Sequence, residues 1–209
     1  LGDVYKRQPD TWDFPGGQER EAAELVQEIC RYKMYFGDKG GVTVSGGEPL
    51  LQPAFVGELF RLLHGEGIHT ALDTSGVWAD WDGACQVLEH TDLILGDLKF
   101  ATPEEYRLHC KADMEKPLAF YRLAEERGIP LWVRHVVVPG LNDSLEDMGK
   151  IKVLAESFSN LEKIEWLPFH NLCVEKYQSL GIPFPLAGTD NMDEEALQRL
   201  VEQLNAEGA

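Results

Sequence analysis

The sequence predicts a single α/β domain built on a parallel β-sheet. Segments with the apolar spacing of helices alternate with five strand-like segments along the chain. The strand-like segments are mainly continuous apolar runs, which is typical of parallel strands covered by helices. No internal repeat, low-complexity tract or Pro/Ser-rich linker divides the chain. Two architectures stay open, a doubly wound sheet and a partial (β/α) barrel, because periodicity does not distinguish them.

In the N-terminal half, the elements follow from apolar spacing and from turn residues. Pro53 suits a first helical position, and a glycine-rich stretch that begins at Gly37 ends the helix before it. The expected helices are 18–36, 53–67 and 81–90, and the expected strands are 42–44, 68–76 and 91–99.

In the C-terminal half, the clearest start signal is a capping box. Thr102 is the predicted N-cap, Pro103 follows it, and Glu105 stands three residues after the cap. The expected helices are 102–110, 116–128, 144–158 and 193–208, and the expected strands are 129–140 and 161–170.

Composition excludes several classes of function. The net charge of −17 argues against a nucleic-acid partner, which needs clustered Lys and Arg. No apolar run reaches bilayer length and no secretory signal is recognisable, so no membrane partner is expected. The four cysteines are scattered without C-x-x-C spacing, which favours reduced thiols and a cytoplasmic location. Residues 1–8 carry no structural pattern, so we expect a ragged or foreign stretch there and the domain over 9–209.

Polar side chains stand near the carboxyl end of every predicted strand. Ligands bind there in both candidate architectures, so we expect an active site for a polar, charged ligand. The residues are Ser45, Gly46, Gly47 and Glu48 after the first strand, Asp73, Thr74 and Ser75 after the second, Asp97 and Lys99 after the third, Arg134 and His135 in the fourth, and His170 after the fifth.

Each of these groups also has a structural interpretation. The alternatives are a helix cap for Ser45 and Glu48, an Asx turn for Asp73, a surface ion pair for Asp97 and Lys99, and a structural role for His170. Pro49 disfavours helical geometry at Glu48 and weakens the first alternative. Because all these groups are expected at the same edge of the sheet, we favour a binding site in which a glycine loop and the Glu48 carboxylate face the cavity.

Six stretches, taken in order, resemble the signature segments of the radical S-adenosylmethionine enzymes that activate pyruvate formate-lyase. The resemblance covers nearly the whole chain from residue 9 to the terminal helix, and it is specific in the combination and order of the segments. The stretches are PDTWDF (9–14), GGVTVSGGEPLLQ (40–52), HTALDTSG (69–76), DLILGDLK (92–99), WVRHVVVPGLND (132–143) and EKIEWLPFH (162–170).

The resemblance implies an incomplete (β/α)6 barrel, S-adenosylmethionine, and a 4Fe–4S cluster held by a C-x3-C-x2-C motif. In such enzymes a 5′-deoxyadenosyl radical removes a hydrogen atom from a backbone glycine of the partner, and the cofactors carry this chemistry. The implied partners are a glycyl-radical enzyme, most specifically pyruvate formate-lyase, and a flavodoxin-like or ferredoxin-like electron donor. A monomer is expected.

The resemblance also assigns roles to residues. Gly46, Gly47 and Glu48 match the loop that binds the methionine amino group, and Lys99 matches the contact to the methionine carboxylate. Arg134 and His170 match polar contacts on the cofactor and the rim, and with Lys99 they are the predicted catalytic residues. A monovalent-cation site beside the cofactor, suited to hard oxygen ligands, is matched by Asp73, the Thr74 carbonyl, the Leu95 carbonyl and Asp97.

The chain departs from the family at the cluster motif. The cysteine triplet should precede PDTWDF, where this chain has LGDVYKRQ, and the four cysteines present lack its spacing. The family's first strand is not matched either, so we expect the chain to bind no cluster and to be inactive as it stands. The interval from Thr11 to Gly40 holds one cysteine and no cysteine-rich insert, which favours the pyruvate formate-lyase type. Two alternatives stay open: another radical S-adenosylmethionine enzyme, whose target is a different glycyl-radical protein or a small molecule, and a non-catalytic partner-binding module.

Overall fold

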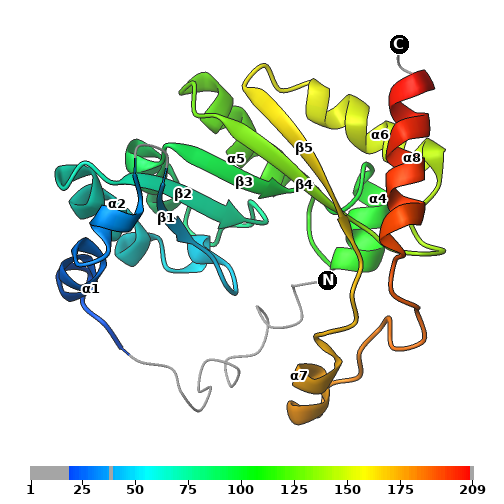
Figure 1. The fold of residues 1–209 in the computed structure, drawn as a ribbon, viewed down its shortest axis with the longest axis horizontal. Helices are drawn as coiled ribbons and strands as arrows, with labels where there is room; N and C mark the ends of the chain where they lie inside the picture. The colour runs from blue at the N-terminus through cyan, green and yellow to red at the C-terminus, as the bar shows by residue number, and fades with distance from the viewer. Residues whose placement is uncertain (1–18, 38–39, 208–209) are drawn as a thin grey trace.

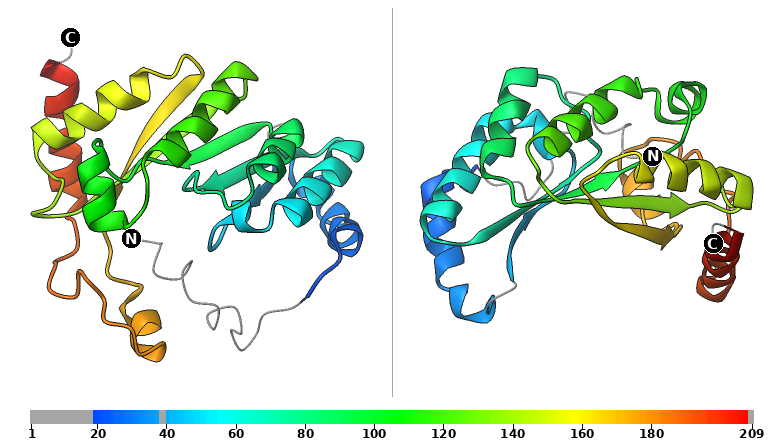
Figure 2. Two further views of the ribbon diagram at one scale, coloured as in Figure 1. Left: turned by 180° about the vertical axis from the view of Figure 1, so that it is seen from behind. Right: turned by 90° about the horizontal axis from the view of Figure 1, so that it is seen from above.

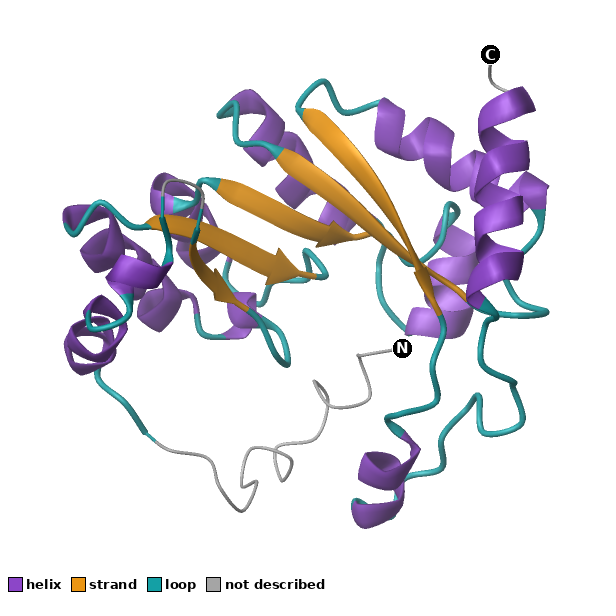
Figure 3. Cartoon of the chain, viewed as in Figure 1, coloured by secondary structure: helices purple, strands orange, loops and turns teal. Residues whose placement is uncertain are grey.

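The fold is organised around a five-stranded parallel sheet (Figures 1 and 3). The computed structural model describes residues 19–37 and 40–207, so the predicted boundary at residue 8 and the stretch PDTWDF lie outside the described residues. The strands are β1 (Gly41–Val44), β2 (His69–Thr74), β3 (Leu93–Asp97), β4 (Leu131–Val137) and β5 (Leu161–Pro168). All five expected strands are therefore confirmed.

The order of the strands decides between the two architectures. They pair in chain order, β1-β2-β3-β4-β5, and every pairing is parallel. Right-handed crossovers that always step in one direction place their helices on one face of the sheet, whereas a doubly wound sheet requires a reversal of strand order. The ribbon viewed from above has α2, α5 and α6 on one side of a curved sheet (Figure 2). The described part is a partial barrel.

The helices follow the apolar spacing, with two differences from the expectation. The helix predicted over 18–36 is shorter: α1 ends at Cys30, and the side chains of Tyr32, Met34 and Tyr35 beyond it are exposed instead of packing on a helix face. A helix that was not predicted, α7, follows β5. The elements are α1 (Ala22–Cys30), α2 (Pro53–Gly65), α3 (Trp81–Val87), α4 (Pro103–Glu105), α5 (Glu115–Glu126), α6 (Leu145–Glu156), α7 (Val174–Ser179) and α8 (Glu194–Glu207), with 3₁₀ turns η3 (Lys33–Tyr35), η4 (Pro49–Leu51) and η5 (Leu88–His90) and the π-helical turn η6 (Tyr106–Cys110).

The predicted cap at Thr102 is confirmed, with a modified capping box. The Thr102 hydroxyl oxygen accepts from the Glu105 backbone N–H at 3.3 Å, as a cap does. The Glu105 carboxylate accepts from the Thr102 hydroxyl at 2.6 Å rather than from the backbone of the cap. Helix α4 continues directly into η6, which ends at Lys111 with a positive φ of 53°.

Burial in β4 alternates, which differs from the two-sided burial that the apolar runs predicted. Leu131 and Val133 are fully buried against the helices, whereas Trp132 and Arg134 on the other face are partly exposed. The reason is that the described helices α2, α5 and α6 cover one face (Figure 2), while Arg134 on the other face lines a cavity at the strand ends. The main core lies under the helices and includes Phe60, Leu63, Leu72, Ile94 and Phe120.

Two predictions from composition can be compared with the fold. All four cysteines are free, as expected for reduced thiols. Among residues 19–37 and 40–207, no helix has both the length and the apolar character needed to cross a bilayer.

Candidate functional site

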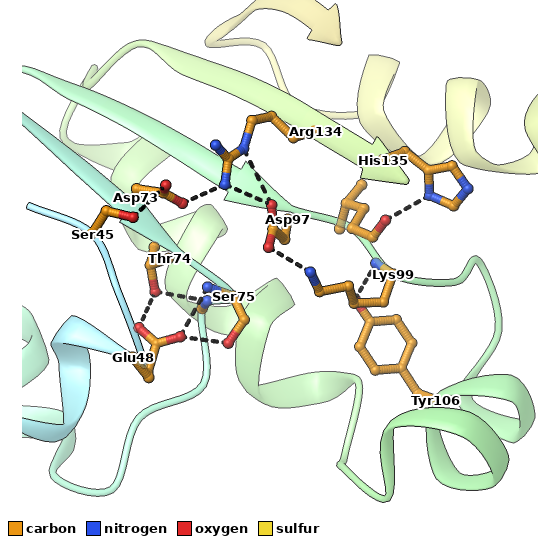
Figure 4. A network of polar contacts seen from close by, with 12 residues as sticks. Ser45, Glu48, Asp73, Thr74, Ser75, Asp97, Lys99, Tyr106, Arg134 and His135 are labelled. Carbon is orange, nitrogen blue, oxygen red and sulfur yellow. Dashed lines mark hydrogen bonds and ion pairs between the residues drawn. The ribbon is translucent and has the colours of Figure 1, made fainter. Parts of the chain in front are cut away.

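A cavity of about 230 Å³ lies at the carboxyl ends of β1 to β4. Its wall combines a glycine loop with carboxylates and cations, so most of the polar groups predicted for this rim meet in one place (Figure 4). The predicted residues in the wall are Ser45, Gly46, Gly47, Asp73, Thr74, Ser75, Asp97, Lys99 and Arg134.

The loop after β1 uses its two glycines for backbone conformation. Gly46 has a φ of 88° and Gly47 a φ of 52°, a region that other residues adopt at a cost. A Cβ at either position would meet no atom within 4 Å, so conformation rather than crowding favours glycine here. Glu48 is extended, with φ −135° and ψ 110°, which confirms a loop instead of a helical capping box.

The Glu48 carboxylate holds this loop to the end of β2. It accepts from the backbone N–H groups of Leu50 at 3.2 Å and Ser75 at 2.9 Å, and from the hydroxyls of Thr74 and Ser75. Glu48 is 5% exposed. The expectation that its carboxylate faces the cavity is wrong for this structure, because the hydrogen-bond donors of the β2 end turn it inward.

The other two carboxylates, Asp73 and Asp97, face cations across the cavity. The Arg134 guanidinium reaches both: its Nε and Nη2 lie 3.2 and 3.1 Å from Asp97 Oδ1, and Nη2 also donates to Asp73. Lys99 Nζ lies 2.5 Å from Asp97 Oδ2, and the Ser45 hydroxyl donates to Asp73 at 2.8 Å. Register brings Arg134 next to Asp97, because these residues pair directly between β3 and β4. The Asp97–Lys99 pair is therefore no surface ion pair.

The electrostatics of this group favour its ionised state. Burial opposes the charge on Asp97, but Lys99 and Arg134 outweigh burial and hold its pKa below the usual value. Burial likewise opposes the Lys99 ammonium, and Asp97 outweighs it, so that the pKa of Lys99 is raised. Two carboxylates and two fixed cations give the cavity wall both signs of charge, as a zwitterionic ligand requires.

The residues predicted for a monovalent-cation site lie at the carboxyl ends of the paired strands β2 and β3. Asp73 on β2 pairs in register with Leu95 on β3. Thr74 is the next residue on β2, and Asp97 stands two residues after Leu95 on β3. Within the described residues the two carboxylates are bridged by Arg134, so occupation of this place by a cation stays a prediction.

Four predicted residues stand apart from the cavity wall. The prediction of His135 at the rim is wrong, because its side chain is buried on the face of β4 opposite Arg134. His170 follows β5 and is exposed, Leu95 lies inside β3, and Glu48 is buried beneath the loop. Two tyrosines were missed. Tyr106 accepts from the Lys99 backbone N–H at 3.0 Å, and the Tyr121 hydroxyl lies 3.2 and 3.3 Å from the carbonyls of Thr74 and Asp97. Both come from helical segments whose local sequence reads as ordinary apolar packing.

The described residues do not fit an iron–sulfur cluster. Such clusters need several cysteine thiolates at one place. Of the four cysteines only Cys110 belongs to the cavity wall, and residues 19–37 and 40–207 contain no group of three metal-binding side chains.

Comparison with known proteins identifies the family. Residues 5–150 match the radical SAM superfamily. The chain belongs to that superfamily. The family implies S-adenosylmethionine and a 4Fe–4S cluster as cofactors.

Similar curated proteins carry one name. A pyruvate formate-lyase-activating enzyme of Clostridium pasteurianum is 38% identical over 202 residues, which is 96% of this chain and 84% of that protein. The enzyme of that name from Staphylococcus epidermidis is 39% identical over 98% of this chain and 84% of its own length.

Solved structures agree on the fold. A domain of pyruvate-formate lyase-activating enzyme from Bacteroides vulgatus has a TM-score of 0.62 and 25% identity, covering 80% of this chain and 94% of that one. SuiB of Streptococcus suis bound to S-adenosylmethionine has a TM-score of 0.62 at 13% identity, over 90% of this chain and 39% of that one. The second likeness concerns the fold alone and supports the partial barrel of radical SAM proteins.

Proposed function

We propose that this chain is an activating enzyme for pyruvate formate-lyase that binds S-adenosylmethionine in the strand-end cavity. The observation that carries the proposal is the meeting of the Gly46–Gly47 loop, Lys99 and Arg134 with two carboxylates in one cavity. The names of relatives that share 38–40% identity over most of the chain support the choice of partner.

The cavity residues suit the methionine end of the cofactor. In the proposal, the loop of Gly46, Gly47 and Glu48 holds the amino group through its backbone, while Glu48 fixes the shape of the loop from below. Lys99 and Arg134 receive the carboxylate, since both carry cations at the cavity wall. When bound, S-adenosylmethionine would supply the 5′-deoxyadenosyl group that removes a hydrogen atom from a glycine of the partner.

The proposal also includes a cation and two protein partners. A monovalent cation would lie among Asp73, Asp97 and the carbonyls of Thr74 and Leu95, with Arg134 turned toward the cofactor. His170 would contact the cofactor from the rim if the segment after β5 closes over the cavity. A flavodoxin-like or ferredoxin-like electron donor and a monomeric, cytoplasmic protein complete it; light scattering would test the oligomeric state.

Cofactor binding is tested on the chain itself. Calorimetry is expected to detect binding of S-adenosylmethionine. Lys99→Met and Arg134→Met should each lower the affinity about tenfold, because each removes a charge-assisted contact. The matched controls, Lys150→Met and Arg199→Met, remove exposed cations on α6 and α8 and should leave binding unchanged. Equal effects of site and control variants would contradict the assignment of the site.

Activation requires the cluster ligands that the described residues do not provide. The chain is joined to the cysteine-bearing segment of a pyruvate formate-lyase-activating relative and reconstituted with iron and sulfide. Electron paramagnetic resonance on pyruvate formate-lyase, with S-adenosylmethionine and a reductant, should then detect a glycyl radical. A loaded cluster and bound S-adenosylmethionine without any radical on this partner would reject the proposed partner and favour another radical SAM reaction.

A further inference from the structure

A buried histidine on β4 contacts the segment that carries Lys99. His135 is 1% exposed and follows Arg134, so its side chain lies on the opposite face of the strand. Its Nδ1 lies 2.7 Å from the Leu98 carbonyl oxygen (Figure 4). A carbonyl oxygen can only accept, so Nδ1 carries the proton.

Asn142 fixes the other side of the imidazole. Its Oδ1 accepts from the Val138 backbone N–H at 2.6 Å, which directs its amide nitrogen toward the Val136 carbonyl and His135 Nε2, both at 3.1 Å. Nε2 therefore accepts, and His135 is neutral. Burial lowers the pKa of His135 to about 4, in agreement with this tautomer.

The Leu98 carbonyl oxygen that His135 contacts and the Lys99 backbone nitrogen are parts of the same peptide group. The Leu98 carbonyl accepts from His135, and the Lys99 N–H at the other end of the same peptide donates to the Tyr106 hydroxyl oxygen at 3.0 Å. Strand β3 ends at Asp97, so this peptide lies beyond the regular part of the strand. Side chains from β4 and η6 therefore hold both ends of the peptide from which the Lys99 side chain leaves the backbone.

We propose that His135, oriented by Asn142, is a positioning residue that places the Lys99 ammonium in the cofactor cavity. Lys99 and Asp97 both line that cavity, and their ion pair of 2.5 Å is the immediate result of this placement. The proposal rests on the proposed function only where it assigns the cofactor carboxylate to Lys99. His135 itself touches no cavity atom in the arrangement described and acts through the peptide.

The first test needs no ligand. His135→Phe keeps a ring but removes the donor to Leu98, whereas the side-chain nitrogen of His135→Asn can take the place of Nδ1. Lysine acylation is followed by mass spectrometry, with Lys116 as the internal reference because it is also partly buried and contacts Trp78. Phe at position 135 should raise the Lys99 rate about three- to tenfold, as expected for loss of one buried hydrogen bond, and leave Lys116 unchanged. Asn should restore the wild-type rate.

An unchanged Lys99 rate in His135→Phe, or an equal rise at Lys116, would overturn the proposal, because the first means no positioning and the second means general loosening. Failure of Asn to restore the rate when Phe raises it would also count against the hydrogen bond as the cause.

The second test measures affinity for two ligands that differ in the carboxylate. The affinity of His135→Phe for S-adenosylmethionine should fall about three- to tenfold, and its affinity for decarboxylated S-adenosylmethionine less than about twofold, because Lys99 has no carboxylate to meet there. Equal losses for both ligands would mean a merely structural role and overturn the proposal. If the wild-type chain binds neither ligand, the proposed function fails, while the acylation rates still decide whether His135 positions Lys99.

Discussion

The three carboxylates at the ends of β1, β2 and β3 fall into two groups, Glu48 alone and Asp73 with Asp97, and the groups differ in the partners that satisfy them. Glu48 is buried, and among residues 19–37 and 40–207 it accepts from neutral donors that include two backbone N–H groups and two hydroxyls. Asp73 and Asp97, each with 18% of the side chain exposed, are paired with Arg134 and Lys99 at the cavity wall. The difference teaches that a carboxylate at a strand end shapes the site when neutral donors enclose it, and contributes charge to the site when cations face it.

Among the changes that test this difference, Glu48→Gln should have the largest effect on the free energy of unfolding. An amide nitrogen would face groups that themselves donate, leaving buried donors unsatisfied, so we expect a loss of about 3 kcal/mol in the free energy of unfolding. Asp73→Asn keeps an acceptor for Arg134 in a partly exposed place and should cost about 1 kcal/mol. Urea unfolding of both variants measures the difference. Equal losses in the free energy of unfolding would mean that Glu48 and Asp73 contribute to stability in the same way.

The pH dependence of stability separates the cation-paired Asp97 from the buried neutral His135. Because the pKa of His135 is lowered from 6.5 to about 4, its stabilising effect is full above pH 6.5 and is lost as the pH falls toward 4. Linkage predicts a loss of about 2 kcal/mol between pH 7 and pH 5. The pKa of Asp97 is lowered from 3.8, so Asp97 stays ionised in this window and loses its contribution only at lower pH.

Denaturant unfolding at pH 7 and pH 5 checks this expectation. His135→Phe should remove most of the dependence in that window, and Asp97→Asn should leave it unchanged. If the free energy of unfolding of His135→Phe still falls by about the same amount between pH 7 and pH 5, the pH dependence comes from other groups.

The smallest effects concern single hydroxyls, one in each group. Thr74→Val removes a donor to the buried Glu48 without changing size, and should cost about 1.5 kcal/mol. Ser45→Ala removes a donor to Asp73, which retains Arg134, and should cost about 0.5 kcal/mol or less. Thermal melts of the two variants give the comparison. A larger loss for Ser45→Ala would reverse the roles assigned to the two groups.

Sequence reasoning reached the strands, the loop and most of the wall of the cavity because these depend on local patterns. The β-branched run before Ser45 makes a strand, the glycines and Pro49 exclude a helix there, and the carboxyl ends of parallel strands share one rim. Asp73, Asp97, Lys99 and Arg134 meet for that reason.

Most contacts of the polar groups at the strand ends were decided by tertiary structure. Glu48 finds three of its donors on Thr74 and Ser75, 26 and 27 residues further along the chain, and His135 reaches Leu98 across 37 residues. Tyr121 reaches the carbonyls of Thr74 and Asp97 from helix α5. Local spacing carries no signal for such contacts, because the register of strands and the packing of helices against them set which distant residues become neighbours. The sequence by itself determined where polar groups gather, and the folded chain determined which of them are enclosed and which face the cavity.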